Sequence, residues 1–170
     1  MKIRRPRLQD GFTLVELLIV VVILGVLAAI AIPQFSASTD DSKAAALDAT
    51  LSNLRTAIEL YYQQHGSYPS AVAAGGSFGA INTEAAFRDQ LVNYTSATGA
   101  ASATKDATYK YGPYLKKSTI PADPIKNVAT VEVVTTGTLG LTATATDPGG
   151  WKFDNKTGQL IANITAYQTR

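Results

Sequence analysis

The sequence GFTLVE at residues 11–16, together with the apolar run at residues 17–32 that follows it, decides the fold of this chain. A helix of that length, at about 1.5 Å per residue, is long enough to cross a hydrocarbon core of roughly 30 Å. Glu16 lies near one end of the run, where a carboxylate is costly in lipid and marks a functional position with a partner. We therefore predict a membrane-spanning helix that carries one functional acid.

The residues before this helix are basic. Lys2, Arg4, Arg5 and Arg7 precede the apolar run, and Asp10 is the acid that opposes them. By the positive-inside tendency, this excess of cations holds the N-terminus in the cytoplasm. The remainder of the chain is therefore expected to be exported.

The segment GFTLVE after a short basic leader resembles the type III signal of type IV pilins and of type II secretion pseudopilins. The resemblance implies that a membrane prepilin peptidase cuts between Gly11 and Phe12 and methylates the new amine of Phe12. It also implies that this amine pairs with Glu16 of a neighbouring subunit. An unpaired carboxylate would be worse in a low dielectric than a paired one, so the pair can set the axial register between subunits.

Two other interpretations of the N-terminal segment stay open. The pattern at residues 29–31 (Ala-Ile-Ala) fits an ordinary secretory signal that is removed after Ala31. The segment could also be a plain signal anchor for a monomeric domain. Asp10, Glu16 and the helical pattern that continues beyond Ala31 argue against the secretory signal.

The composition leaves room for one domain and its anchor in 170 residues. The leader takes four of the 15 Lys and Arg residues and one of the 13 Asp and Glu residues, so the mature chain is nearly neutral. We therefore expect no nucleic-acid partner.

The chain has no cysteine, so its stability must come from packing. Many type IV pilins close a C-terminal loop with a disulfide, and its absence here favours a pseudopilin, or a pilin that holds this loop in another way.

Helical pattern continues after the apolar run. Pro33 predicts a kink or local break near residues 31–35, because proline removes a helix hydrogen bond. Beyond it, apolar residues recur at steps of three and four and predict one buried helix face, and Gly66 predicts the helix end. The residues of this face are Leu47, Leu51, Leu54, Ile58, Tyr61 and His65.

The rest of the chain predicts a short helix and a small sheet. Residues 83–94 indicate a helix capped at Asn82 or Thr83 that buries Phe87 and Leu91. Residues 128–135 and 141–146 predict one hairpin, and residues 151–153 and 159–164 predict a second. The Gly-Ser-Tyr-Pro at residues 66–69 and the ending at residues 149–163 also resemble the pilin and pseudopilin family.

We therefore predict a pilin-like α+β fold, in which a long N-terminal helix packs on a small C-terminal antiparallel sheet. The first half of the helix is transmembrane and its second half is amphipathic. The expected segments are a leader at 1–11, the assembly helix at 12–33, its amphipathic half at 34–66, a variable loop region with a short helix at 67–108, and the sheet region at 109–170.

The sequence offers no catalytic arrangement, so we predict that the chain is not an enzyme. His65, the single histidine, lies on the buried helix face and is expected to pack or cap there. We predict no cofactor. The major pseudopilin binds calcium in its C-terminal loops, and Asp123, Asp147 and Asp154 are the weak calcium candidates here.

The resemblance implies a structural filament subunit, most simply in the pseudopilus of a type II secretion system, or else in a surface pilus for adhesion, motility or DNA uptake. Gly11 and Phe12 are the predicted processing residues, and Glu16 and Pro33 the predicted assembly residues. The implied partners are copies of the chain, minor pilins or pseudopilins, the prepilin peptidase, an inner-membrane platform protein, a cytoplasmic ATPase and membrane lipid. The implied location is the bacterial inner membrane, with a periplasmic or extracellular C-terminal domain, and then the filament.

Overall fold

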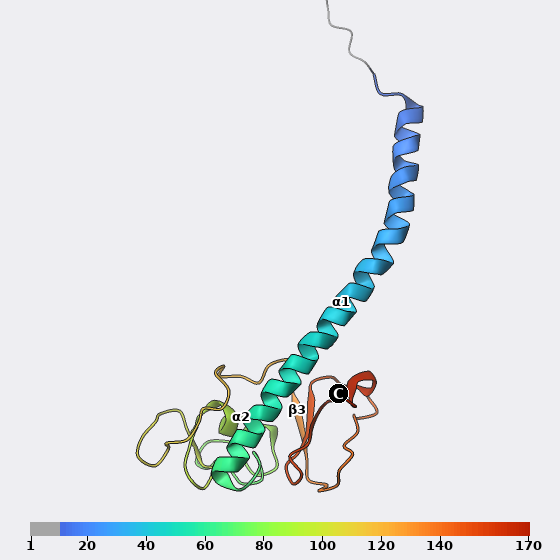
Figure 1. The fold of residues 1–170 in the computed structure, drawn as a ribbon. Helices are drawn as coiled ribbons and strands as arrows, with labels where there is room; N and C mark the ends of the chain where they lie inside the picture. Colours follow the sequence, from blue (N-terminus) through green and yellow to red (C-terminus); the bar gives the residue numbers. More distant parts are fainter. Residues whose placement is uncertain (1–10) are drawn as a thin grey trace, which may run out of the picture. The chain divides into compact units, whose positions relative to one another are not determined.

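The computed structural model describes residues 11–170, apart from the side chains of residues 31–37. Predictions about the leader at residues 1–10 therefore lie outside the described residues. The chain divides into two units, one ending at Ser42 and the other running from Lys43 to Arg170. Helix α1 (Leu14–His65) passes through both of them (Figure 1).

The second half of α1 has one buried face, and it is the face predicted from the sequence. Leu47, Leu51, Leu54, Ile58 and Tyr61 are each no more than 1% exposed. The predicted helix end is also confirmed. Gly66 follows the last helical residue with a φ of 69°, a left-handed conformation that glycine adopts without steric cost.

The backbone of α1 stays helical through Pro33, so the predicted local break is not formed. A proline removes one hydrogen bond of the helix, and the neighbouring turns can hold the helix together across that gap. The predicted assembly role of Pro33 concerns a side chain that lies outside the described part.

Among the helical residues that the structure describes, no stretch is both long enough and apolar enough to cross a membrane.

A short helix and a small sheet follow α1 in the unit from Lys43 onward. Helix α2 (Glu84–Val92) begins after Thr83, whose hydroxyl accepts a hydrogen bond from the Ala86 amide at 3.1 Å. It buries Phe87 and Leu91 as predicted. Strands β1 (Tyr94–Thr95) and β2 (Ala101–Ser102) pair antiparallel and were not predicted. Strands of two residues are too short to show the alternation that identifies a strand in a sequence.

The larger sheet has three strands in the order β3 (Val131–Val134), β4 (Trp151–Asp154) and β5 (Leu160–Ala162). Strands β4 and β5 form the predicted antiparallel hairpin, with Phe153 opposite Leu160. Strand β3, however, pairs parallel to β4. The sheet is therefore mixed, and the prediction of a wholly antiparallel sheet is wrong for this pair.

The predicted hairpin between residues 128–135 and 141–146 is also wrong, because residues 141–146 form no strand. Instead, the backbone amides of this segment donate hydrogen bonds to side chains that lie later in the chain. The Leu141 amide donates to Gln159 Oε1 at 2.9 Å, and the Thr144 amide donates to Asn163 Oδ1 at 2.8 Å. Since these donors are satisfied, the segment can cross between β3 and β4 as a loop.

The core lies between α1, α2 and the larger sheet. Trp151 and Phe153 of β4 and Leu160 of β5 pack in one cluster with the buried face of α1, which confirms the predicted packing of the helix on the sheet. The rings of Phe87 and Phe153 lie 4.7 Å apart between centroids. Burial of each such side chain contributes about 1.5–3 kcal/mol to folding, so packing alone can stabilise this cysteine-free domain. The 3-10 helix η1 (Thr165–Tyr167) follows β5.

Candidate functional site

The first turn of α1 is closed by Thr13 and Glu16. The Thr13 amide and hydroxyl donate to Glu16 Oε2 at 2.9 and 2.8 Å, and the Glu16 amide donates to Thr13 Oγ1 at 3.2 Å. This reciprocal pattern is a capping box, which satisfies amides that have no partner within the helix. The spacing Thr-x-x-Glu is the sequence signal for this cap, which is not among the features predicted above.

The capping box places the predicted processing site outside the helix. Gly11 and Phe12 precede the first helical residue, Leu14, and lie in no regular structure. Phe12 is 75% exposed. A peptide bond just before a capped helix can be bound in extended form by a protease without unwinding a turn. Cleavage between Gly11 and Phe12 stays a prediction, as do the assembly roles of Glu16 and Pro33.

The large apolar side chains within residues 12–30 are exposed, and no described part of the chain covers them. Leu14 is 81% exposed and Ile30 is 63% exposed, and the large aliphatic side chains between them each expose about half of their surface or more. An exposed apolar area of this extent marks contact with lipid or with other protein chains.

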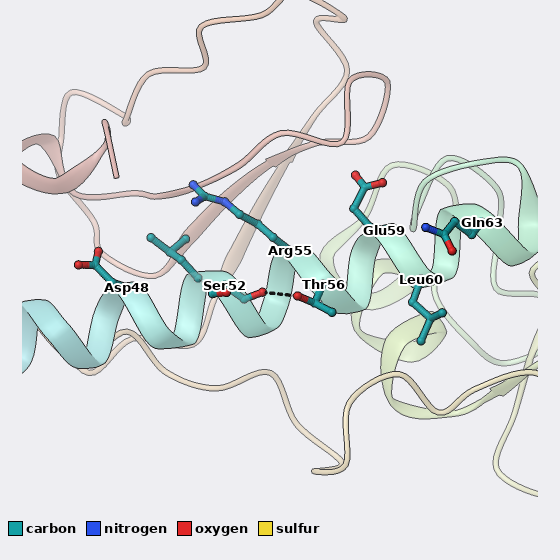
Figure 2. A pocket seen from close by; sticks show the side chains of 8 residues that line it. Asp48, Ser52, Arg55, Thr56, Glu59, Leu60 and Gln63 are labelled. Carbon is teal, nitrogen blue, oxygen red and sulfur yellow. Dashed lines mark hydrogen bonds between the residues drawn. The ribbon is translucent and has the colours of Figure 1, made fainter.

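The unit from Lys43 to Arg170 carries a groove along one flank of α1 (Figure 2). The groove has a volume of about 530 Å³, with apolar contributions from Leu51 and Leu60. Asp48, Arg55 and Glu59 lie along the same side of the helix in Figure 2. The other lining residues are Ser52, Thr56 and Gln63.

The charges at this groove differ in whether they have partners in the chain. The Arg55 guanidinium donates to the Leu160 carbonyl at 2.8 Å and to the Arg170 carbonyl at 2.6 Å. Asp48 pairs with Arg170 at 2.5 Å. Glu59 is exposed and forms no hydrogen bond or ion pair with the residues that the structure describes. Of the two carboxylates that line this groove, Glu59 is therefore the one that has no cationic partner among the described residues.

A second groove, of about 510 Å³, lies on the other flank of α1, between the helix and residues 114–121. Leu54, Ala57 and Leu60 contribute its helix side. Lys116 and Lys117 stand at its edge, and both are exposed. Within the described part of the chain, neither lysine forms an ion pair.

His65 joins the end of α1 to the segments that follow it. Its Nε2 lies 2.8 Å from the Tyr114 hydroxyl and 3.0 Å from Thr95 Oγ1, and its ring packs at 4.2 Å from that of Tyr61. Burial lowers the pKa of His65 below its ordinary value of 6.5, and a weaker opposing contribution comes from the Ala97 carbonyl. The predicted packing role of His65 is therefore the one that the structure shows.

Asp123, the first calcium candidate, is buried and surrounded by amide donors. Its carboxylate accepts hydrogen bonds from the backbone amides of Ile125, Lys126, Val128 and Gly150 at 2.6 to 3.0 Å. These bonds join the turn after Asp123 to the start of β4. Donors of this kind occupy the oxygen lone pairs that a calcium ion would need.

The other two candidates also bind donors. Asp147 pairs with Lys126 at 2.6 Å, and the Lys126 side chain holds its pKa below the ordinary value. Asp154 accepts from the Thr136 hydroxyl and from the Gly137 amide at 2.8 Å; burial raises its pKa, but these hydrogen bonds outweigh burial and lower it. The described residues contain no group of three potential metal ligands. The prediction of no cofactor, with these three acids as weak calcium candidates, stays a prediction.

Comparison with known proteins agrees with the resemblance of the N-terminal segment to the signal of type IV pilins and pseudopilins. Residues 6–32 match the family model of the prokaryotic N-terminal methylation motif. The chain is 39% identical to type II secretion system core protein G of Pseudomonas aeruginosa over 64 residues, which cover 38% of this chain and 45% of the relative. It is 38% identical to a fimbrial protein of Neisseria meningitidis over 69 residues, or 41% of each chain.

A third relative matches over nearly the whole length. The chain is 27% identical to type II secretion system core protein G of Aeromonas hydrophila over 158 residues, which cover 88% of this chain and 96% of the relative. In the first two relatives, by contrast, the match spans less than half of the length. No solved structure matches the chain.

Proposed function

We propose that this chain, a homologue of type IV pilins and of type II secretion core protein G, is the structural subunit of a pseudopilus in a type II secretion system. The observation that carries the proposal is the methylation motif at residues 6–32, in a chain whose similarity to a core protein G extends over 96% of that relative. The subunit itself carries out no catalysis. Its chemistry is that of assembly.

The exposed apolar side chains of α1 support this function. Before assembly, residues 12–33 would lie in the inner membrane with the N-terminus in the cytoplasm, because lipid is the solvent that covers such side chains. In the filament, the same side chains would be covered by the helices of other copies. The unit from Lys43 to Arg170 would then form the filament surface.

Glu16 is suited to join two copies because its two oxygens have different environments. Oε2 accepts both hydrogen bonds from Thr13, whereas Oε1 accepts none from the described residues. Cleavage after Gly11 would create a cation at Phe12. We propose that Oε1 of one subunit binds the methylated Phe12 amine of a neighbour, while the capping box keeps the carboxylate in place.

The test is to replace Glu16 and to follow cleavage and assembly separately. Glu16→Ala is expected to leave leader cleavage largely intact and to depress filament yield, because the Phe12 amine loses its counter-charge. Thr13→Ala is the matched control, since it removes the capping box and leaves the carboxylate. It should reduce filament yield less than Glu16→Ala does. A normal yield of filaments from Glu16→Ala would contradict the proposed role.

Sequencing of the mature N-terminus separates this function from the two simpler ones. A methylated Phe12 is the result expected for a filament subunit. An intact Met1 would show a plain membrane anchor, and an N-terminus at Ile32 would show ordinary secretion. Either of these would overturn the proposal.

A surface pilus is the second candidate, and the similarity to the Neisseria fimbrial protein favours it. Deletion of the gene distinguishes the two uses. Loss of secreted proteins from the medium with no change in surface fibres supports the pseudopilus. Loss of surface fibres with normal secretion supports the pilus.

A further inference from the structure

We propose that the groove on the Glu59 flank of α1 binds the Lys116–Lys117 loop of a second copy of this chain. The inference rests on the proposed function and specifies one lateral contact between filament subunits. Both surfaces belong to the unit from Lys43 to Arg170.

The groove sets two requirements for its occupant. Asp48 and Arg55 already have partners, so Glu59 is left as the groove's carboxylate that no cation among the described residues pairs with. Leu60, which is 44% exposed, also lines the groove and offers an apolar surface there. Lysine meets both requirements, because its aliphatic stem packs on apolar surface while its ammonium group reaches an anion.

The chain itself presents two adjacent lysines in a suitable form. Lys116 and Lys117 lie in an exposed loop whose two ends are fixed. At one end, the amides of Tyr114 and Leu115 both donate to the Leu91 carbonyl at 2.9 Å. At the other end, the indole of Trp151 donates to the Pro121 carbonyl at 2.8 Å. Fixed ends reduce the entropy that the loop would lose on binding.

The two surfaces lie on two flanks of the same helix and share Thr56 and Leu60 as their common border. A contact between the Glu59 flank of one copy and the lysine flank of the next is therefore heterologous. Each copy keeps one free surface of each kind, so the contact can be repeated from copy to copy. A contact of this type is what a filament needs, and a symmetric dimer would not use it.

The experiment is a charge exchange in the full chain, expressed with its processing and assembly machinery. Glu59→Lys alone, and Lys116→Glu with Lys117→Glu, should each reduce the yield of sheared, sedimented filaments by roughly tenfold or more, since like charges then face one another. The combination of all three substitutions should restore the yield to within about threefold of the wild type, because opposite charges face one another again.

Lys156→Glu is the matched control, because it reverses an exposed lysine that lines neither groove. It should leave the yield unchanged. The proposal is overturned if the single-sided reversals assemble normally, or if the combined variant is no better than they are. Absence of filaments from the wild type would contradict the proposed function instead.

Chemical cross-linking tests the same contact in wild-type filaments made from mixed isotope-labelled copies. Carbodiimide should link Glu59 to Lys116 or Lys117 between copies. A link found solely within one copy would count against the contact.

Discussion

At the scale of single residues, Tyr61 carries a polar group that the fold does not use. Its side chain is fully buried in the core, and its hydroxyl has no hydrogen-bond partner among the described residues. Burial also raises the pKa of this phenol, and the nearby Tyr114 raises it further. The hydroxyl lies against Gly99, where an added Cβ would come within 2.6 Å of it. Tyr61 thus contributes through its ring and not through its oxygen.

We therefore predict that Tyr61→Phe leaves the free energy of unfolding unchanged or raises it by up to about 1 kcal/mol, because a buried unsatisfied hydroxyl carries a desolvation cost. Chemical denaturation of the full chain in a mild detergent measures this. Tyr61→Leu serves as the control, since it also removes ring contacts with His65 and Tyr114 and should destabilise the fold. A clear loss of stability in Tyr61→Phe would show that the hydroxyl has a partner, such as an internal water.

His65 makes stability depend on pH at mildly acidic values. Its pKa in the folded chain is lowered, chiefly by burial, from an ordinary value of 6.5. As pH falls below 6.5, the unfolded chain binds a proton that the folded chain binds less tightly, so unfolding becomes more favourable. Burial raises the pKa of the neighbouring Tyr61 and Tyr114 phenols, so both remain neutral in this range.

We predict that the free energy of unfolding falls between about pH 6.5 and pH 5, and that His65→Gln removes most of this slope. Denaturation curves across this range test the prediction. The lowered pKa values of Asp147 and Asp154 cause a separate loss of stability at lower pH, which His65→Gln should leave in place. An unchanged slope between pH 6.5 and pH 5 would assign the effect to another group.

At the scale of elements, those with a strong periodic pattern were predictable. The face of α1 from Leu47 to Tyr61 and the hairpin of β4 and β5 follow directly from apolar spacing and turn residues. The parallel pairing of β3 with β4 does not, because strand propensity carries no information on the direction of the partner. It depends on side chains distant in sequence, such as Asn163 and Gln159, which hold the crossing loop.

The residues proposed to act in assembly also differ in how far the sequence predicts them. The motif at residues 11–16 is sufficient on its own to predict a functional role for the acid at Glu16. The grooves on α1 could not be predicted, since they depend on residues 114–121 lying beside the helix. The sequence also does not show that the Arg55 guanidinium donates its hydrogen bonds to carbonyl groups. Glu59 is therefore left without a cationic partner among the described residues, which the sequence does not show either.

Asp123 connects the turn at residues 123–128 with β4, and its removal should therefore weaken the sheet. Asp123→Asn turns one acceptor oxygen into a donor that faces amides, among them that of Gly150. We predict a loss of about 1–3 kcal/mol in the free energy of unfolding. Asp106→Asn is the control, because the exposed Asp106 accepts the amides of Thr108 and Tyr109 through Oδ1, which asparagine retains. Equal effects of the two substitutions would contradict this role for Asp123.

At the scale of the whole molecule, the acidic turns should make the fold independent of calcium. Asp123, Asp147 and Asp154 each bind hydrogen-bond donors of the chain, and no cluster of ligands is present among the described residues. We predict that a calcium chelator leaves the melting temperature of the full chain unchanged. A drop on chelation that added calcium reverses would reveal a site that this arrangement does not provide.

The two units of the chain differ in what they need from their surroundings. The large core cluster draws its residues from Leu47 to Tyr167, so it lies wholly within the unit from Lys43 to Arg170. The apolar side chains from Phe12 to Ile30, in contrast, are exposed and contribute nothing to that core. Folding of the second unit should therefore not depend on the first.

We predict that a chain beginning at Lys43 is a soluble monomer with the fold of the full protein, because removing residues 1–42 exposes no buried side chain of the core cluster. Sedimentation in the absence of detergent measures its mass. Near-ultraviolet circular dichroism, which reports on the buried Trp151, should match that of the full chain in detergent. The full chain without detergent should instead sediment as large assemblies, since its apolar residues must find other copies to cover them. A truncated chain that loses the Trp151 signal would show that the N-terminal half of α1 stabilises the domain.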